Sequence, residues 1–244
     1  MEWNILEIIK CKSYRDLSLQ VGIDIEYQVS RNSKLVLGLA TGSTPTGVYE
    51  YLKSSTVDFS EVRTFNLDEY VGLEPEFNSR LKGKKGYGVP KHKQSYYYFM
   101  NEHLFNEVKF KRSFFPGESQ SDTYDSLINA CGGIDIQILG IGTNGHIAFN
   151  EPGTSRDSLT HVVDLTENTI KDNSRFFDSI DDVPKQATTM GIESIMRAKQ
   201  IYLLANGKHK KDILEKACYG DITSDIPASY LQEHKNIKVL YCDW

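Results

Sequence analysis

The sequence KLVLGLATGSTPTG at residues 34–47 joins an uninterrupted apolar run to a turn rich in glycine and hydroxyl residues. The apolar run, Lys34–Ala40, predicts a strand buried on both faces, because no polar residues alternate with the apolar ones. Thr44 and Pro45 then indicate a helix start, with threonine as the N-cap and proline at the first helical position. A strand that leads through such a turn into a helix is the repeating unit of a parallel α/β sheet.

The same alternation continues along the chain. The expected strands are residues 62–67, 134–141, 200–205 and 236–242, and the expected helices are residues 96–105 and 208–218. Strands of this kind separated by helices predict an α/β fold: a single doubly wound, mostly parallel sheet with helices on both faces, Rossmann-like, in one domain over residues 1–244. Such sheets bind their ligands beyond the carboxyl ends of the strands.

The composition excludes several classes of protein. The 244 residues are 39% hydrophobic and 25% charged, which is ordinary for a globular domain. No apolar run reaches the length of a membrane-spanning helix, and the mean hydropathy is -0.43. The net charge of -5 argues against nucleic acid as a partner. Four widely spaced cysteines without a CxxC pair, and a start without a basic leader, predict a reduced, cytoplasmic chain.

One segment breaks the alternation of strands and helices. Residues 74–91, EPEFNSRLKGKKGYGVPK, hold few large apolar side chains but three glycines, two prolines and a cluster of lysines. This composition predicts a solvated, mobile loop. A role in gating a site or attracting phosphate is the alternative.

Two segments that follow predicted strands carry residues suited to chemistry. The turn at Gly42, Ser43 and Thr44 opens a helix, where free backbone N–H groups and the helix dipole favour an anion. A plain capped turn is the alternative there. Asp68 and Glu69 directly follow the second strand, and a buried carboxylate at that place can act as a general base. Magnesium binding and an N-cap are the alternatives for these acids.

The most informative segment is residues 139–153, LGIGTNGHIAFNEPG. Glycines after a strand let the backbone approach a ligand closely. Histidine is suited to proton transfer near neutral pH, and a carboxylate such as Glu151 can orient His146 and raise its basicity; a purely structural histidine is the alternative. The chain lacks HExxH and GxSxG, so the pattern favours acid–base chemistry over a metal site or a nucleophilic serine.

Taken together, these segments resemble the glucosamine-6-phosphate deaminase (isomerase) family. The resemblance runs from about Lys34 to Cys242 and rests on ATGSTP, FNLDEYVGL, SYYYFM, GIGTNGHIAFNEPG, NSRFF and DDVPKQATTMG, in the family's order. The related 6-phosphogluconolactonases share the fold, but DEY and FNEP stand here in place of their DER and SLFP-type continuations. The resemblance implies conversion of D-glucosamine 6-phosphate to D-fructose 6-phosphate and ammonia, in amino-sugar catabolism, with no cofactor and no metal.

The resemblance also implies roles for single residues. His146 matches the family's acid/base for pyranose ring opening, and Glu151 matches its carboxylate partner. Asp68 matches the base that moves a proton from C2 to C1. Asn144 stands at a family position that is Asp in some members and Asn in others, so here it can only hydrogen-bond.

For the substrate phosphate, the resemblance implies the backbone around Gly42, Ser43 and Thr44 together with Arg175 and Lys210. Arg175 lies in NSRFF, within a segment that resembles the family's mobile, helical lid at about residues 164–184. A guanidinium can fork onto phosphate oxygens.

Two departures from the family pattern bear on regulation. The basic loop at 74–91 is longer than the usual connection, and the chain stops at Trp244 without the extension of the allosteric members. His161 and Val163 stand where the cations of the activator site belong. We therefore expect a monomer without allosteric activation and without a membrane partner.

Two alternatives to the glucosamine-6-phosphate deaminase activity stay open. One is a galactosamine-6-phosphate deaminase/isomerase. The other is a non-catalytic phosphosugar sensor, which is disfavoured because the catalytic acids are present.

Overall fold

The computed structural model describes residues 6–75, 92–117, 121–174 and 177–242. Most of the expected basic loop, residues 76–91, lies outside this described part, and so does Arg175. The predictions made for that loop and for that side chain therefore stay predictions.

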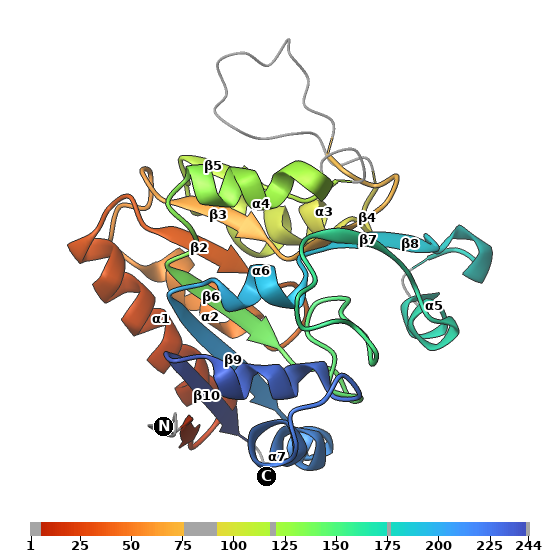
Figure 1. Ribbon diagram of the computed structural model, residues 1–244. Coiled ribbons are helices and arrows are strands. Elements are labelled where there is room, and N and C mark those ends of the chain that lie inside the picture. The colour runs from red at the N-terminus through yellow and green to blue at the C-terminus, as the bar shows by residue number, and fades with distance from the viewer. Residues whose placement is uncertain (1–5, 76–91, 118–120, 175–176, 243–244) are drawn as a thin grey trace.

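Within the described residues, seven parallel strands form a central sheet in the order β1-β10-β9-β6-β2-β3-β5 (Figure 1). They are β1 (Glu7–Lys10), β2 (Val36–Leu39), β3 (Arg63–Asn66), β5 (Arg112–Phe114), β6 (Ile136–Gly140), β9 (Gln200–Asn206) and β10 (Ile237–Cys242). The chain runs outward from β2 to β3 and β5, then returns to β6 on the other side of β2. This reversal confirms the doubly wound fold and places the topological switch point between β2 and β6.

Helices cover both faces of this sheet. They are α1 (Tyr14–Arg31), α2 (Thr46–Ser54), α3 (Tyr96–Met100) with a π-helical turn at Asn101–Phe105, α4 (Ser121–Ala130), α6 (Ile192–Met196) and α7 (Lys211–Tyr219). The remaining helix, α5 (Glu167–Asn173), packs apart from these layers, in a small cluster with Tyr70 and Ala187. Short 3₁₀ segments occur at Ile180–Asp182, Lys208–Lys210 and Pro227–Glu233. Strand side chains alternate between the two layers: Leu37 and Leu39 pack with α1 and α2, and Val36 packs with α4, α6 and α7.

The first helix was not among the sequence expectations, although its sequence supports it. Ser13 is the N-cap, and its hydroxyl accepts a hydrogen bond from the Asp16 backbone N at 3.1 Å. Apolar side chains then recur every four residues, and all of them are buried: Leu17, Val21, Ile25 and Val29. The helix packs against α2, which brings its first turn beside the segment that follows β2.

A second, smaller sheet was also not predicted. It is antiparallel, in the order β4-β8-β7, with β4 (Asp68–Tyr70), β8 (Gln186–Thr189) and β7 (His161–Asp164). Leu67 alone separates β3 from β4, and it is shared between the sheets: its N donates to Leu39 O and its O accepts from Met190 N. The arrowheads of β2, β3 and β6 point toward the side of the molecule that carries β7, β8 and α5 (Figure 1).

The predicted cap of α2 was wrong. The helix starts at Thr46. Pro45 occupies the N-cap position, and its side chain makes no capping hydrogen bond. The Tyr14 hydroxyl, from α1, instead accepts a hydrogen bond from the Gly47 backbone N at 2.7 Å. A group distant in sequence thus satisfies the donor that a local threonine was expected to satisfy.

The remaining large-scale expectations concern membranes and disulfides. Within the described ranges, no helix is long and apolar enough to cross a membrane. All four cysteines lie in the described part, and none of them forms a disulfide, as the sequence predicted.

Candidate active site

Four neighbouring strands deliver the candidate residues to one edge of the central sheet. In the sheet order β9-β6-β2-β3, all the pairings are parallel, so the carboxyl ends of these strands share an edge. Lys210 follows β9, the 142–151 turn follows β6, the Gly42–Thr44 turn follows β2 and Asp68 follows β3. The structure therefore brings together, on both sides of the switch point, residues that the sequence spreads over more than half of the chain.

The turn that carries His146 is held firmly from within and from outside. The Gly142 N donates to His146 O at 2.8 Å, and the Ala228 N donates to Gly145 O at 2.9 Å. Ala148 has a φ of 53°, a left-handed conformation that non-glycine residues seldom adopt. The buried Asn150 amide secures this bend, since its Nδ2 donates to Ile147 O and to Met190 O.

Three side chains form a relay in this turn. Asn144 Nδ2 donates to Glu151 Oε2 at 2.7 Å, and Asn144 Oδ1 lies 2.8 Å from His146 Nδ1. Because a carboxylate oxygen only accepts, the amide nitrogen must face Glu151, so the amide oxygen faces the imidazole. His146 Nδ1 is therefore the donor, and Nε2 of the neutral ring is left to accept a proton.

Glu151 supplies the negative charge of this relay. Its Oε1 lies 3.5 Å from His146 Nδ1 and accepts a hydrogen bond from Thr169 Oγ1 at 3.2 Å. Burial alone would raise the pKa of Glu151, but its hydrogen bonds to His146 and Asn144 outweigh burial and lower the pKa below its usual value. Glu151 is thus held as an anion, which suits it to orient and stabilise a protonated imidazole.

The Cα of Gly142 packs closely against the imidazole ring of His146. A Cβ at this position would lie 2.3 Å from His146 Cε1 and 2.4 Å from Nδ1. The ring belongs to a side chain that is about one-third exposed, at 35%, so it has room to move away. A methyl group there would therefore displace the imidazole rather than unfold the turn.

We accordingly expect Gly142→Ala to fold normally but to lose about 100-fold in kcat, because displacement of a reacting group by about 1 Å costs that much. The measurement is kcat of the variant beside its circular-dichroism melting curve. Gly140→Ala is the matched control, since a Cβ at Gly140 would meet no atom within 4 Å. Equal losses in both variants would show that the contact with His146 is not the cause.

Asp68 and Glu69 are adjacent in β4, yet their carboxyl groups have different surroundings. Asp68 is 6% exposed, and its carboxylate accepts no hydrogen bond from the part of the chain that the structure describes. Burial raises the pKa of Asp68 to about 7. A carboxylate that gains a proton near neutral pH and has no other partner meets the requirements of a general base.

Glu69 is instead committed to a helix. Its Oε1 accepts from the backbone N of Tyr70 and of Tyr96, both at 2.9 Å, and its Oε2 accepts from the Tyr97 N at 2.8 Å. Burial raises the pKa of Glu69 to about 8, although these three donors work in the opposite direction. Ser95 is the N-cap of α3, and Glu69 supplements it by accepting from the first two backbone N–H groups of a helix that begins 27 residues later.

The turn after β2 presents donors that no described residue takes up. The backbone N–H groups of Gly42, Ser43 and Thr44 have no acceptor within the described ranges, and Gly42 has a φ of 102° that favours glycine. The Tyr14 hydroxyl also contacts this turn, at 2.9 Å from Ser43 O and 3.1 Å from Thr44 O. Successive free N–H groups at a helix start form an anion site.

Lys210 is the candidate cation that the structure describes. It lies in the 3₁₀ segment before α7, as expected, and it forms no ion pair with any described residue. Burial lowers the pKa of Lys210. A half-buried ammonium without an acidic partner is stabilised by a bound anion.

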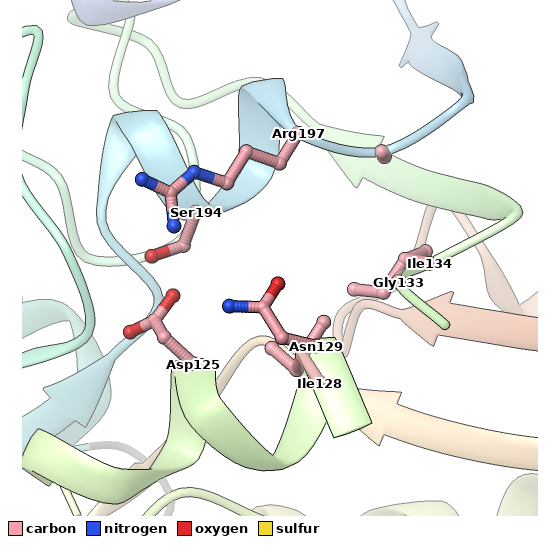
Figure 2. A pocket seen from close by; sticks show the side chains of 8 residues that line it. Asp125, Ile128, Asn129, Gly133, Ile134, Ser194 and Arg197 are labelled. Atoms are coloured by element: carbon pink, nitrogen blue, oxygen red, sulfur yellow. The ribbon is translucent and has the colours of Figure 1, made fainter. Parts of the chain in front are cut away.

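A small polar cavity lies at the opposite edge of the sheet (Figure 2). It is lined by Asp125 and Asn129 of α4, by Ser194 of α6 and by Arg197, which directly follows α6, close to the amino ends of β6 and β9. Its volume is about 40 Å³, far below the several hundred Å³ that ligand pockets occupy. It is therefore not the place for a sugar phosphate.

Sequence reasoning missed three residues of this region. Glu69 was seen only as a second acid, and Tyr14 and Thr169 were not singled out. Tyr14 and Thr169 act through contacts to segments 33 and 18 residues away. No local motif contains both partners of either contact. In the resemblance, SYYYFM covers the helix that contacts Glu69 and the lid segment contains Thr169, whereas Tyr14 precedes the resembling segments.

Comparison with known protein families agrees with this geometry. The family model of glucosamine-6-phosphate isomerases/6-phosphogluconolactonase matches residues 87–240, well over half of the chain. The chain belongs to this family.

Relatives within the glucosamine-6-phosphate isomerase/6-phosphogluconolactonase family cover almost the whole chain. A glucosamine-6-phosphate deaminase of Lachnoclostridium phytofermentans is 46% identical over 97% of this chain and 99% of its own. One of Oceanobacillus iheyensis is 45% identical over 96% of this chain and 93% of its own.

Solved structures of the family share the fold. A monomeric glucosamine-6-phosphate deaminase superimposes with a TM-score of 0.86 at 38% identity, over 97% of both chains. A 6-phosphogluconolactonase from Thermotoga maritima superimposes with a TM-score of 0.72 at 21% identity, over 98% of this chain and 100% of its own. The second likeness concerns the fold alone.

Proposed function

We propose that this protein is a glucosamine-6-phosphate deaminase that converts D-glucosamine 6-phosphate to D-fructose 6-phosphate and ammonia. One observation carries the proposal: three features lie at the same edge of the sheet, namely the buried carboxylate of Asp68, the His146–Asn144–Glu151 relay and the turn at Gly42–Thr44, and neither the carboxylate nor the N–H groups of the turn have a partner among the described residues. The names of relatives that are 42% to 50% identical support it. The free thiols fit a cytoplasmic enzyme of amino-sugar catabolism.

The first step is ring opening at His146. Imidazole Nε2 takes the proton of the C1 hydroxyl while the bond between C1 and the ring oxygen breaks. The same nitrogen then returns the proton to the departing ring oxygen, which becomes the C5 hydroxyl. Asn144 fixes the tautomer that leaves Nε2 free, and the Glu151 anion stabilises the imidazolium between the two transfers.

The second step is a proton transfer at Asp68. Its carboxylate removes the proton from C2 of the open aldehyde, and the electron pair moves through C1 onto the carbonyl oxygen, which takes a proton from solvent water to give an enolamine. The proton that Asp68 took from C2 then goes to C1, leaving an iminium at C2. Water adds to that carbon and ammonia leaves, which gives the ketone. A single carboxylate held over both carbons suffices for the transfer.

The substrate phosphate binds across the switch point, between the turn after β2 and Lys210, which follows β9. The N–H groups of Gly42, Ser43 and Thr44 donate to its oxygens, and Lys210 neutralises its charge. Arg175, assigned by resemblance, completes the site from the lid segment at residues 164–184. Contacts at the phosphate hold C1 and C2 beside the acid–base groups at the far end of the sugar.

The decisive experiment is incubation of the purified protein with D-glucosamine 6-phosphate while ammonia and fructose 6-phosphate are measured. Stoichiometric release of both products supports the proposal. Hydrolysis of 6-phosphogluconolactone without ammonia would assign the chain to the other branch of its family. Binding without turnover would indicate a sensor. The ratio of kcat/KM for the gluco and galacto sugars decides between the two deaminases, which share this chemistry.

We further propose that the enzyme is a monomer without allosteric activation. Val163, in β7, provides no charge for a second phosphate site, and His161 Nδ1 already contacts Leu159 O at 2.7 Å. An effector that binds no state preferentially shifts no equilibrium. Substrate saturation should be hyperbolic with or without N-acetylglucosamine 6-phosphate, and sedimentation should give one chain. A sigmoidal curve that the effector turns hyperbolic would contradict this.

A further inference from the structure

We propose that Thr169 is a positioning residue that ties the α5 helix to Glu151 and keeps that carboxylate beside His146. Thr169 lies in the first turn of α5, within the segment expected to be the lid, and 18 residues separate it from Glu151. The kinetic consequence rests on the proposed function, whereas the structural consequence does not.

The two oxygens of Glu151 are held from different directions. Asn144 Nδ2 donates to Oε2 at 2.7 Å from within the same turn. Thr169 Oγ1 donates to Oε1 at 3.2 Å from α5, and this is the oxygen that lies 3.5 Å from His146 Nδ1. One contact alone would let the carboxylate rotate about the Oε2 anchor. Both contacts together fix the plane of the carboxylate relative to the imidazole.

The number of available protons determines which hydroxyl donates in each of these hydrogen bonds. The Thr169 backbone N donates to Thr166 Oγ1 at 3.2 Å, and the two threonine hydroxyls lie 2.9 Å apart. Each hydroxyl has one proton, and an ionised carboxylate can only accept. The chain therefore runs from the Thr169 N–H to the Thr166 hydroxyl, then to the Thr169 hydroxyl, and ends at Glu151.

The same threonines also form the start of the helix, which links helix formation to the site. Thr166 is the N-cap of α5, so its hydroxyl both caps the helix and donates to Thr169. Within the described residues, His146 is the titratable group that contacts the Glu151 carboxylate, and α5 contributes the neutral Thr169. Formation of the first turn of α5 thus supplies one neutral donor to the catalytic relay.

The test compares Thr169→Val, which keeps the shape of the side chain but removes the donor, with Thr169→Ser, which keeps the donor. Loss of a hydrogen bond to the charged form raises the pKa of a carboxyl group. In Thr169→Val, the Glu151 carboxyl carbon should therefore titrate at higher pH by carbon-13 NMR. We expect kcat to fall about three- to tenfold with KM nearly unchanged, since the phosphate contacts remain.

Thr154→Val is the matched control. The Thr154 hydroxyl donates to the backbone O of Glu151 at 2.7 Å and not to its carboxylate, so this variant should leave the carboxyl titration unmoved. Restoration by Thr169→Ser completes the expected result. The proposal is overturned if Thr169→Val titrates like the wild type, or if the Val and Ser variants lose equally. The NMR titration needs no turnover, so it stands even if the wild type proves not to be a deaminase.

Discussion

Asp68→Asn is expected to abolish deamination while it leaves substrate affinity within about tenfold of the wild type, because the amide keeps the shape of the carboxylate but cannot accept the C2 proton. The measurements are ammonia release and substrate binding by calorimetry. Formation of fructose 6-phosphate by this variant at near the wild-type rate would remove Asp68 from the role of the base.

The same residue should set the acid limb of the pH profile. Burial raises the pKa of Asp68 to about 7, and the base acts only when it is ionised. In the wild type, kcat/KM should therefore rise as the pH increases through about 7, where Asp68 loses its proton. A profile that is flat between pH 6 and pH 8 would contradict this assignment.

Asp68→Asn should raise the stability of the protein although it abolishes the activity. The pKa of Asp68 in the folded protein, about 7, exceeds the ordinary value of 3.8, so the folded chain binds this proton more tightly than the unfolded chain. The contribution of Asp68 to stability is thus fully present below about pH 4 and is lost as the pH rises through 7. At pH 8, Asp68→Asn should raise the free energy of unfolding by on the order of 1–4 kcal/mol. An inactive but more stable variant cannot be inactive through misfolding.

His146→Gln is the second variant with a large expected effect. Glutamine can still contact Asn144, but it cannot take up and return a proton, so turnover of the cyclic sugar should fall by about 10²- to 10⁴-fold. Affinity for an open-chain 2-amino-hexitol 6-phosphate should be almost unaffected, since binding rests on the phosphate contacts. The comparison of kcat on the substrate with Kd for the open-chain ligand separates the two roles.

The open-chain ligand is the control for the His146→Gln variant, because it binds without ring opening. If His146 were a general binding residue, cyclic and open-chain ligands would lose affinity equally, and kcat would change less than KM. If the ring-opening role is correct, the loss lies in kcat alone.

The sequence by itself was sufficient for the fold class and for the strand ends that carry the candidate residues. Uninterrupted apolar runs separated by helical stretches specify a parallel sheet, because only strands covered on both faces lack polar alternation. Once β2 and β6 are parallel neighbours, the turns after them must share an edge. The glycines of the 139–153 segment and the adjacent His146 and Glu151 are local in sequence, so their proximity was predictable.

Tertiary structure decided what each acid does. Asp68 and Glu69 are neighbours of the same type of charge, and no local pattern distinguishes them. The backbone N–H groups of α3 reach Glu69, whereas Asp68 has no donor among the described residues, so one carboxyl anchors a helix and the other remains the candidate base. Burial and hydrogen bonding are properties of the assembled chain, and they set the two pKa values.

Tertiary structure also decided which distant side chains support the site. Tyr14 replaces the expected threonine cap of α2, and Thr169 reaches Glu151 from α5. Both contacts join segments whose separation in sequence carries no periodic signal. The strands and the turns that follow them are specified by local sequence, whereas the strand order and the orientation of the side chains depend on contacts that exist only after the layers have packed.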